Sequence, residues 1–186
     1  GCLPEVAAEG LCDRNPSDPD QFLDGYDWWD VSQVDGWTLP YKVEVQGPCG
    51  NVPPVTDCSL LQLSACPVTE YLGETHGNQS LQLVDPEDES LVIGCYSPCG
   101  KLTYSNWGEG YAYTPESPEA RWYCCPTPPI SPAQCSDGPV ASALYTRTVH
   151  ERCPGVYAYA YDDGMGLNKC EAGSNVVYEV TFYCPA

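Results

Sequence analysis

The sequence predicts a mainly β protein whose strands form the core and whose second lobe consists of short helices and loops held by disulfides. Apolar and polar residues alternate strictly over residues 41–45, and every second residue over 176–184 is apolar, which is typical of half-buried strands. Residues 59–153 contain only short helical patterns, interrupted by proline and glycine. Thirteen cysteines in 186 residues indicate a disulfide framework.

The charge of the chain excludes two classes of partner. It has 26 acidic and 7 basic side chains, for a net charge of −19. Such a surface repels nucleic acid and anionic lipid, so we expect neither as a partner. No apolar run approaches the roughly 20 residues that span a membrane, so we expect no membrane insertion. Since neither an initiator methionine nor a signal peptide is present, we expect that Gly1 begins a processed or partial chain.

The cysteines predict a secreted, extracellular protein, because disulfides persist in oxidising compartments. A zinc site would need paired cysteine knuckles or accompanying histidines, and the chain has only His76 and His150. We therefore predict no metal and no cofactor. The sequon that begins at Asn78 fits secretion and predicts glycosylation there. Because thirteen is odd, at least one sulfur lacks a partner within the chain.

Residues 26–45 carry the candidate site. We predict two strands joined by a turn at Val34-Asp35-Gly36, with the second strand beginning after Pro40. Asp30 and Asp35 lie five residues apart around this turn, and Trp28, Trp29 and Trp37 crowd it. Carboxylates beside aromatic planes are what a sugar-binding groove requires. The alternative is a plain hairpin in which each aspartate only satisfies backbone groups of the turn.

The remaining elements follow in order. Residues 1–25 are predicted to be loops, and 46–58 are a Gly/Pro-rich break. The lobe is expected to contain helices at 57–63, from Ser117 and after Pro139, with an exposed acidic loop at 72–92. Alternation of Tyr and Ala over 156–161 predicts a strand, followed by Asp162 and Asp163. The final strand places Val176, Tyr178, Val180, Phe182 and Cys184 on one face.

Several motifs in fixed order resemble the thaumatin-like proteins, which include thaumatin, osmotin and zeamatin. The matching stretches are YDWWDVSQVDGWTLP, SACP, WYCC, RCPGVYAYAYDD and VTFYCPA, and the resemblance runs over essentially the whole chain. It implies a flattened antiparallel β-sandwich, a disulfide-rich lobe and an acidic cleft between them. The expected division is 13–58 and 154–186 for the sandwich core, 59–153 for the lobe, and 1–12 for the remnant of a small disulfide loop.

The resemblance also implies the disulfide pairing. The expected bridges are Cys2–Cys12, Cys49–Cys170, Cys58–Cys153, Cys66–Cys95, Cys99–Cys124 and Cys125–Cys135. The remaining cysteine is Cys184, whose partner in the family lies in an opening strand that this sequence lacks. We therefore expect either that a cleaved N-terminal fragment or a neighbouring chain is bonded through Cys184, or that the sequence is incomplete.

By resemblance, the cleft of the family carries an Arg, a Glu and three Asp. Asp30 and Asp35 match two of the aspartates, and Asp162 matches the third, with Asp163 adjacent. Gln21 stands where the family has its Glu, and the Arg falls in the segment that is lacking. The predicted ligand-binding residues are Asp30, Asp35, Asp162, Asp163, Gln21, Trp28 and Trp37. Asp30, Asp35 and Asp162 are the catalytic candidates, although glycoside hydrolysis needs a matched acid and carboxylate pair.

Three functions follow from these observations. The first is a secreted, antifungal defence protein of the pathogenesis-related type that binds β-1,3-glucan or a related polysaccharide. The second is a weak endo-β-1,3-glucanase that uses the same cleft. The third is an extracellular assembly protein whose sandwich is completed by strands of another chain.

Overall fold

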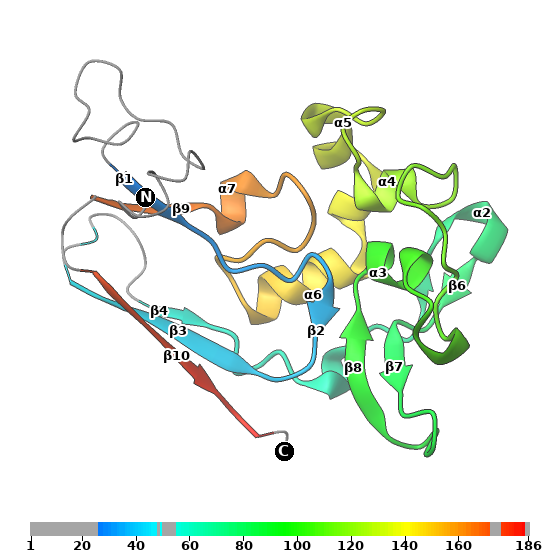
Figure 1. The fold of residues 1–186 in the computed structure, drawn as a ribbon, viewed down its shortest axis with the longest axis horizontal. Coiled ribbons are helices and arrows are strands. Elements are labelled where there is room, and N and C mark those ends of the chain that lie inside the picture. The colour runs from blue at the N-terminus through cyan, green and yellow to red at the C-terminus, as the bar shows by residue number, and fades with distance from the viewer. Residues whose placement is uncertain (1–25, 48, 50–54, 172–175, 185–186) are drawn as a thin grey trace, which may run out of the picture.

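The predicted mainly β fold is confirmed by the computed structural model, which describes residues 26–47, 49, 55–171 and 176–184 (Figure 1). Antiparallel strands occupy one end of the molecule, and short helices with further strands occupy the other (Figure 1). The predictions for the loop at 1–12, for the Cys2–Cys12 bridge and for Gln21 lie outside the described residues.

A three-stranded antiparallel sheet in the order β10-β3-β4 contains the two strands that alternation predicts most clearly. Its strands are β3 (Tyr41–Gln46), β4 (Val55–Asp57) and β10 (Val177–Phe182). Along β3, Tyr41, Val43 and Val45 are buried, while Lys42 and Glu44 lie half-exposed on the opposite face. Val43 is paired with Val180 in the register of β3 and β10. One apolar face therefore continues from β3 onto β10.

The predicted hairpin over residues 26–45 does not form. β1 (Tyr26–Trp29) pairs instead with β9 (Asn168–Glu171), about 140 residues further along the chain. β2 (Gly36–Trp37) pairs with β8 (Val92–Tyr96) in the lobe. Each strand thus finds its partner in a distant segment and not across the turn.

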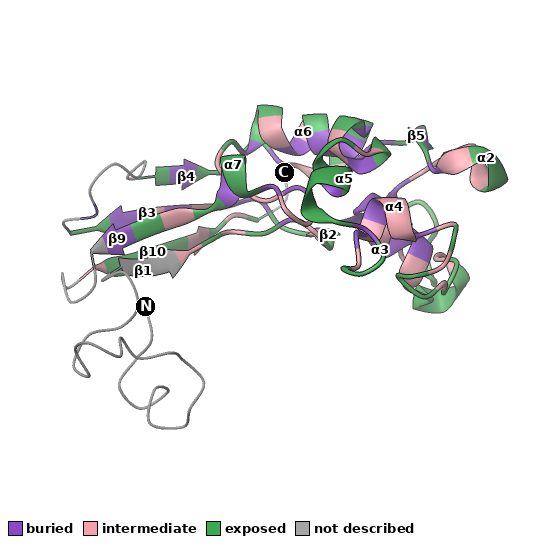
Figure 2. Cartoon of the chain, turned by 90° about the horizontal axis from the view of Figure 1, so that it is seen from above, coloured by how far each residue is buried: buried purple, intermediate pink, exposed green. Residues whose placement is uncertain are grey.

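The β1–β9 sheet packs against the β10-β3-β4 sheet: Figure 1 shows the pair above the three strands, and in the view from above in Figure 2 the two sheets overlap. A small core cluster of Val45, Cys49 and Cys170 joins the two, with Trp29 packed against it. The Cys49–Cys170 disulfide crosses this contact. This layered packing supplies the β-sandwich part of the predicted fold.

The second lobe combines two small sheets with short helices. Its further strands are β5 (Glu70–Tyr71), β6 (Asn78–Gln79) and β7 (Gln82–Val84), in the pairs β5–β6 and β7–β8. The helices are η2 (Leu63–Ala65), α2 (Gly73–His76), α3 (Pro98–Thr103), η3 (Asn106–Gly108), α4 (Arg121–Cys124), α5 (Pro132–Ser136), η4 (Pro139–Ser142), α6 (Leu144–Arg152) and α7 (Asp163–Gly166).

Helix α6 is the longest of these helices, at nine residues. The helix predicted from Pro139 is divided in two: Pro139 begins the short η4, and α6 begins at Leu144 and buries Tyr145, Thr146 and Val149. No helix in the described part of the chain is long and apolar enough to cross a membrane.

The start of the lobe differs from the prediction. The helix expected at 57–63 is wrong, because Asp57 ends β4 and its carboxylate accepts a hydrogen bond from the Ser59 N–H at 2.9 Å. The chain turns there before the single turn of η2. The segment from Ser117 makes turns, and helix α4 begins only at Arg121. The loop expected at 72–92 contains α2, β6 and β7, with Asn78 exposed on β6.

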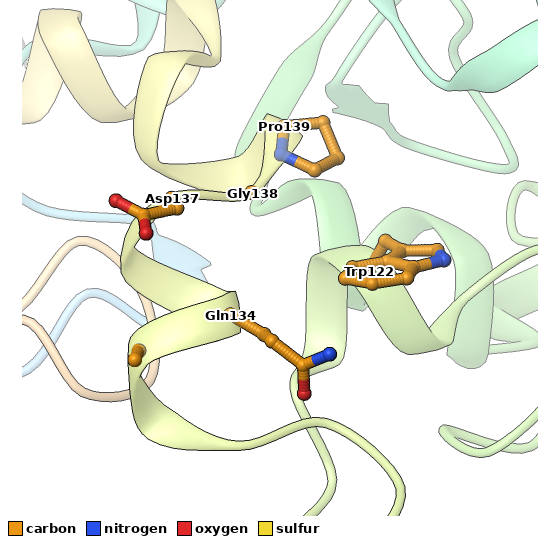
Figure 3. Close-up of a pocket in the computed structure, with 6 residues that line it drawn as sticks. Trp122, Gln134, Asp137, Gly138 and Pro139 are labelled. Carbon is orange, nitrogen blue, oxygen red and sulfur yellow. The ribbon is translucent and has the colours of Figure 1, made fainter.

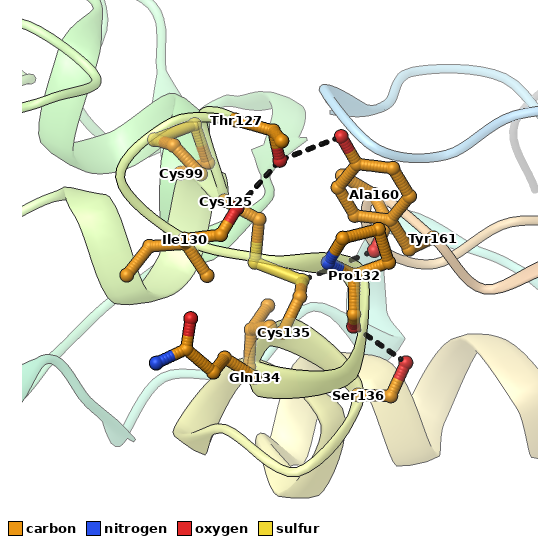
Figure 4. The surroundings of a disulfide bond; sticks show 12 residues. Cys99, Cys125, Thr127, Ile130, Pro132, Gln134, Cys135, Ser136, Ala160 and Tyr161 are labelled. Atoms are coloured by element: carbon orange, nitrogen blue, oxygen red, sulfur yellow. Dashed lines mark hydrogen bonds between the residues drawn. A yellow bond between two sulfur atoms is a disulfide. The ribbon is translucent and has the colours of Figure 1, made fainter.

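The strand expected at 156–161 is also wrong. Only Tyr157 makes a β-bridge, and Tyr161 adopts a left-handed conformation with φ of 65°. The backbone is held by side chains instead, since the Ala158 N–H donates to the Asp162 carboxylate at 2.9 Å. The Tyr161 hydroxyl donates to Thr127 Oγ1 at 2.8 Å (Figure 4). These contacts bend the segment into a loop, so alternation alone misidentified it.

The disulfide pairing implied by the resemblance is confirmed wherever both cysteines are described. The five bridges are Cys49–Cys170, Cys58–Cys153, Cys66–Cys95, Cys99–Cys124 and Cys125–Cys135. Figure 4 shows Cys125–Cys135, whose Cys135 Sγ lies 3.1 Å from the carbonyl oxygen of Ala160. Cys184 is a free and exposed thiol.

Candidate functional site

The segment that follows β1 carries Asp30 at the surface and is joined to a distant loop by its backbone. The Tyr157 N–H donates to the Val31 carbonyl at 2.9 Å, and the Gln33 N–H donates to the Tyr157 carbonyl at 2.7 Å. Ser32 and Tyr157 form a parallel bridge between these two bonds. Asp30, which is exposed, is thereby placed next to the loop that carries Asp162 and Asp163.

Tyr157 lies between the acids. Its hydroxyl donates to Asp163 Oδ1 at 2.6 Å. Burial raises the pKa of the Tyr157 hydroxyl well above its ordinary value, and the bond to Asp163 together with the charges of Asp163, Asp30 and Asp162 raises it further. The phenol therefore stays protonated at neutral pH and donates to a carboxylate. We call Asp30, Tyr157 and Asp163 the acidic site.

Asp162 lies beneath this site and is only 5% exposed. Its Oδ2 accepts from the Ala158 N–H and lies 2.7 Å from His150 Nε2, on helix α6. Asp162 thus fixes the loop from below, whereas Asp163 faces solvent. Of the two adjacent aspartates that the sequence analysis names, the structure places the second one where a ligand can reach it.

Asp35 is exposed, but it lines a different pocket. Its Oδ1 accepts from the Tyr104 hydroxyl at 2.9 Å. The pocket has a volume of about 240 Å³, and Trp37, Tyr96 and Asn106 also line it. Burial first, and then the bond to the Asp35 carboxylate, raises the pKa of Tyr104. Asp30 does not line this pocket, and the groove that Asp30 lines does not include Asp35.

The turn between the two aspartates is held in a shape that only glycine allows at its end. Gly36 has φ of 122°, and a Cβ there would lie 2.1 Å from the carbonyl oxygen of Cys95. Between the acids, Gln33 is buried, and its Nε2 donates to the Tyr41 hydroxyl at 2.5 Å. The Tyr145 hydroxyl donates to the Gln33 carbonyl. Core contacts therefore position Asp30 and Asp35 from below.

The rings of Trp29 and Trp37 are packed against other aromatic rings of the protein. Trp37 is 4% exposed, and its ring centroid lies 5.2 Å from that of Tyr145. Trp29 is half-buried, with its centroid 5.4 Å from that of Tyr178. The side chain of Trp28 lies outside what the structure describes, so its role in stacking stays a prediction. Trp37 is thus mostly buried but lines the Asp35 pocket, and its predicted stacking role stays a prediction.

Next to Asp30 lies an apolar groove of about 410 Å³ between the β1 segment and the β10-β3 face. Asp30 is the only charged residue that lines it. The other lining residues are Trp29, Val31, Ser32, Gln33, Tyr41, Val43, Tyr178, Val180 and Phe182. On the β10 side, Tyr178, Val180 and Phe182 are 40%, 50% and 66% exposed. The groove therefore leaves large apolar side chains open to solvent.

Sequence reasoning did not identify Tyr157, Tyr104 or His150 as site residues. A tyrosine in an alternating run signals a strand, and nothing local indicates that it will meet aspartates on another segment. No cluster of three or more metal-ligating side chains was found among the described residues.

Comparison with known proteins places this site in context. A family model described as "Thaumatin family" matches residues 18–185. The chain is 32% identical over 161 residues to a "Glucan endo-1,3-beta-glucosidase" of Prunus avium, covering 87% of this chain and 50% of that protein. It is 33% identical to "Thaumatin-like protein 2" of Prunus persica, covering 87% and 51%. "Pathogenesis-related thaumatin-like protein 3.5" of Cryptomeria japonica is 31% identical, covering 86% and 50%. The chain thus spans about half the length of these curated relatives.

Proposed function

Because the chain belongs to the thaumatin family, we propose that it is a secreted defence protein that binds β-1,3-glucan or a related polysaccharide at the acidic site. The observation that carries the proposal is the meeting of Asp30, Tyr157 and Asp163 on one exposed surface. Carboxylates accept hydrogen bonds from sugar hydroxyls, and a protonated phenol can donate one in return. A neutral polysaccharide also meets no repulsion from the net charge of −19.

The names of relatives support this class of ligand. One relative is named as a glucan endo-1,3-β-glucosidase, and another as pathogenesis-related. Those names describe those proteins, which are about twice as long as the matched region. For this chain they favour a glucan wall as the ligand and an extracellular location, where five disulfides would persist.

Replacing Asp30 or Asp163 with asparagine is expected to weaken binding of soluble β-1,3-glucan about tenfold, because each change removes a charge-assisted acceptor. Isothermal titration with laminarin measures the effect. Glu116→Gln is the matched control, since Glu116 is an exposed acid of the lobe and its loss changes the net charge equally. Affinity that is unchanged in folded Asp30→Asn and Asp163→Asn variants would contradict the assignment.

Hydrolysis of β-1,3-glucan is expected to be no more than trace. A glycosidase needs a protonated acid and a second carboxylate at a defined separation. Asp162 is engaged by His150 and the Ala158 N–H, Asp35 lines a separate pocket, and Gln21 cannot donate or accept a proton as a carboxyl does. Release of reducing sugar from laminarin measures this. Robust turnover that Asp30→Asn abolishes would favour the glucanase function instead.

A second candidate function, assembly with another chain, is favoured by the apolar groove. β10 is an edge strand in the described sheet, and its exposed Tyr178, Val180 and Phe182 line that groove. Open edges and wet apolar faces invite an added strand. Cys184 lies two residues beyond β10 as an exposed thiol and could bond such a partner.

Native material is therefore expected to carry a second polypeptide on Cys184. Intact mass spectrometry with and without reductant tests this, and the mass is expected to fall on reduction by the mass of the attached chain. Cys184→Ser should remove the attached mass while leaving the internal bridges in place, five of which lie among the described residues. A mass that reduction changes only by the hydrogens of those bridges would contradict the candidate.

A further inference from the structure

A further open pocket, separate from the Asp35 pocket and the apolar groove, lies in the disulfide-rich lobe, on elements that take no part in the acidic site. It has a volume of about 560 Å³, within the range of pockets that hold small ligands. α4 contributes Trp122, and α5 with the turn into η4 contributes the other wall. The lining residues are Trp122, Ala133, Gln134, Asp137, Gly138 and Pro139 (Figure 3). We call this the Trp122 pocket.

The walls of the Trp122 pocket are held rigidly in place. The Cys125–Cys135 disulfide joins the end of α4 to α5, and Cys99–Cys124 joins α4 to α3 (Figure 4). At the start of α5, Ser131 and Gln134 form a capping box. In this capping box the side-chain amide oxygen of Gln134, Oε1, accepts a hydrogen bond from the Ser131 backbone N–H at 3.0 Å. The amide oxygen of Gln134 is thereby occupied, and its NH₂ group is the end left to donate to a ligand.

Trp122 supplies a half-buried aromatic plane. One part of the indole packs against the main core, and the Arg121 guanidinium carbon lies 6.0 Å from the ring centroid. The part of the indole that lines the pocket forms its apolar wall together with Pro139 and Ala133. Figure 3 shows the Gln134 side chain reaching from α5 toward α4, and the Asp137 carboxylate on the far side of the pocket from Trp122, where it points outward.

The lining chemistry selects a neutral ligand with hydroxyl groups. Asp137 is the only charged residue of the lining, and none of the residues that line the pocket is cationic. A phosphate or an acidic peptide would meet the Asp137 carboxylate, and Arg121, the cation beside the indole, is not among the lining residues. A pyranose ring has an apolar face of C–H groups, which suits an indole, and hydroxyls at its edge, which suit an amide donor and a carboxylate acceptor.

We propose that the Trp122 pocket is a second carbohydrate-binding surface, which takes a neutral pyranose unit of the same polysaccharide chain or of a neighbouring one. This proposal takes its class of ligand from the proposed function, but the residues of the Trp122 pocket are different from those of the acidic site. A protein with two such surfaces binds a polymer more tightly than it binds a short oligomer, because the second contact is intramolecular.

Titration of the ¹⁵N-labelled protein with laminaritriose tests the site directly. We expect the indole N–H of Trp122 and the side-chain amide of Gln134 to shift, while the backbone amides of Tyr157 and Ala158 report on the acidic site. Shifts at Trp122 and Gln134 support the proposal even if the acidic site does not respond. Shifts confined to Tyr157 and Ala158 overturn it and leave the proposed function standing, and a titration without shifts overturns both.

Variants test the contribution to polymer binding. Trp122→Ala is expected to weaken binding to laminarin about tenfold, with Trp122→Phe retaining most of it. Asp137→Asn, at an exposed position, should weaken it severalfold without disturbing the core. Trp107→Ala is the matched control, because Trp107 is 65% exposed in the same lobe and does not line the pocket. Equal affinity of folded Trp122→Ala and Trp107→Ala variants would overturn the proposal, as would shifts at Trp122 with a proline-rich peptide but not with the sugar.

Discussion

Replacing Cys58 and Cys153 together with alanine is expected to lower the free energy of unfolding by about 3–4 kcal/mol. The two cysteines are 95 residues apart, so the bridge removes much conformational freedom from the unfolded chain, although the bridges enclosed between them shorten the effective loop. Both side chains are fully buried, and the bond joins the segment after β4 to the end of α6. Its loss therefore loosens the contact between the strands and the lobe.

Equilibrium denaturation in guanidinium chloride measures this loss. The matched control is the double replacement of Cys125 and Cys135, which are also buried but only 10 residues apart. In that variant the unfolded chain gains less freedom, and we expect a smaller loss of about 2–3 kcal/mol. A loss for the Cys58 and Cys153 variant that is no greater than for the control would show that loop length does not govern the stability of this fold.

Replacing Glu70 with alanine is expected to lower the free energy of unfolding by about 2–3 kcal/mol. Glu70 is 3% exposed, and its carboxylate accepts from the backbone N–H groups of Leu144 and Tyr145 at 3.1 and 2.6 Å. These are the first residues of α6, so Glu70 caps the helix from a distant strand and places a negative charge at its positive end. Alanine would leave the buried Tyr145 N–H and the part-buried Leu144 N–H without this acceptor.

The capped helix also supports the acidic site, so Glu70→Ala should affect function as well. Tyr145 on α6 donates to the Gln33 carbonyl between Asp30 and Asp35, and His150 on the same helix holds Asp162. Glu74→Ala, at an exposed position of α2, is the control and should change stability by less than about 0.5 kcal/mol. Thermal and chemical denaturation of both variants measure the difference. If the Glu70→Ala variant were as stable as the Glu74→Ala variant, water would have replaced the Glu70 carboxylate as the acceptor for the first N–H groups of α6.

Glu70 on β5 and Leu144 at the start of α6 are 74 residues apart, and nothing in the local sequence of either one connects them. Glu70 shows no capping pattern with its neighbours in sequence, because such patterns link positions within one turn. The same limit applies to Tyr157, whose neighbours in sequence predict a strand. Its backbone partner Val31 and its charged neighbour Asp30 come from the other end of the chain.

What the sequence by itself determined are the properties that depend on residue type and on near neighbours. The alternation of β3 and β10, the mainly β class and the five described bridges that the motif resemblance implies follow from such patterns. The role of Asp30 in a site also comes from the sequence and stays a prediction, and the structure places this residue at the surface. Only the tertiary structure decided that β1 pairs with β9, that Asp162 is buried while Asp163 is exposed, and that Asp30 and Asp35 line separate pockets. The physical reason is that the partner of a strand or a carboxylate is selected by the burial of faces brought together from distant parts of the chain.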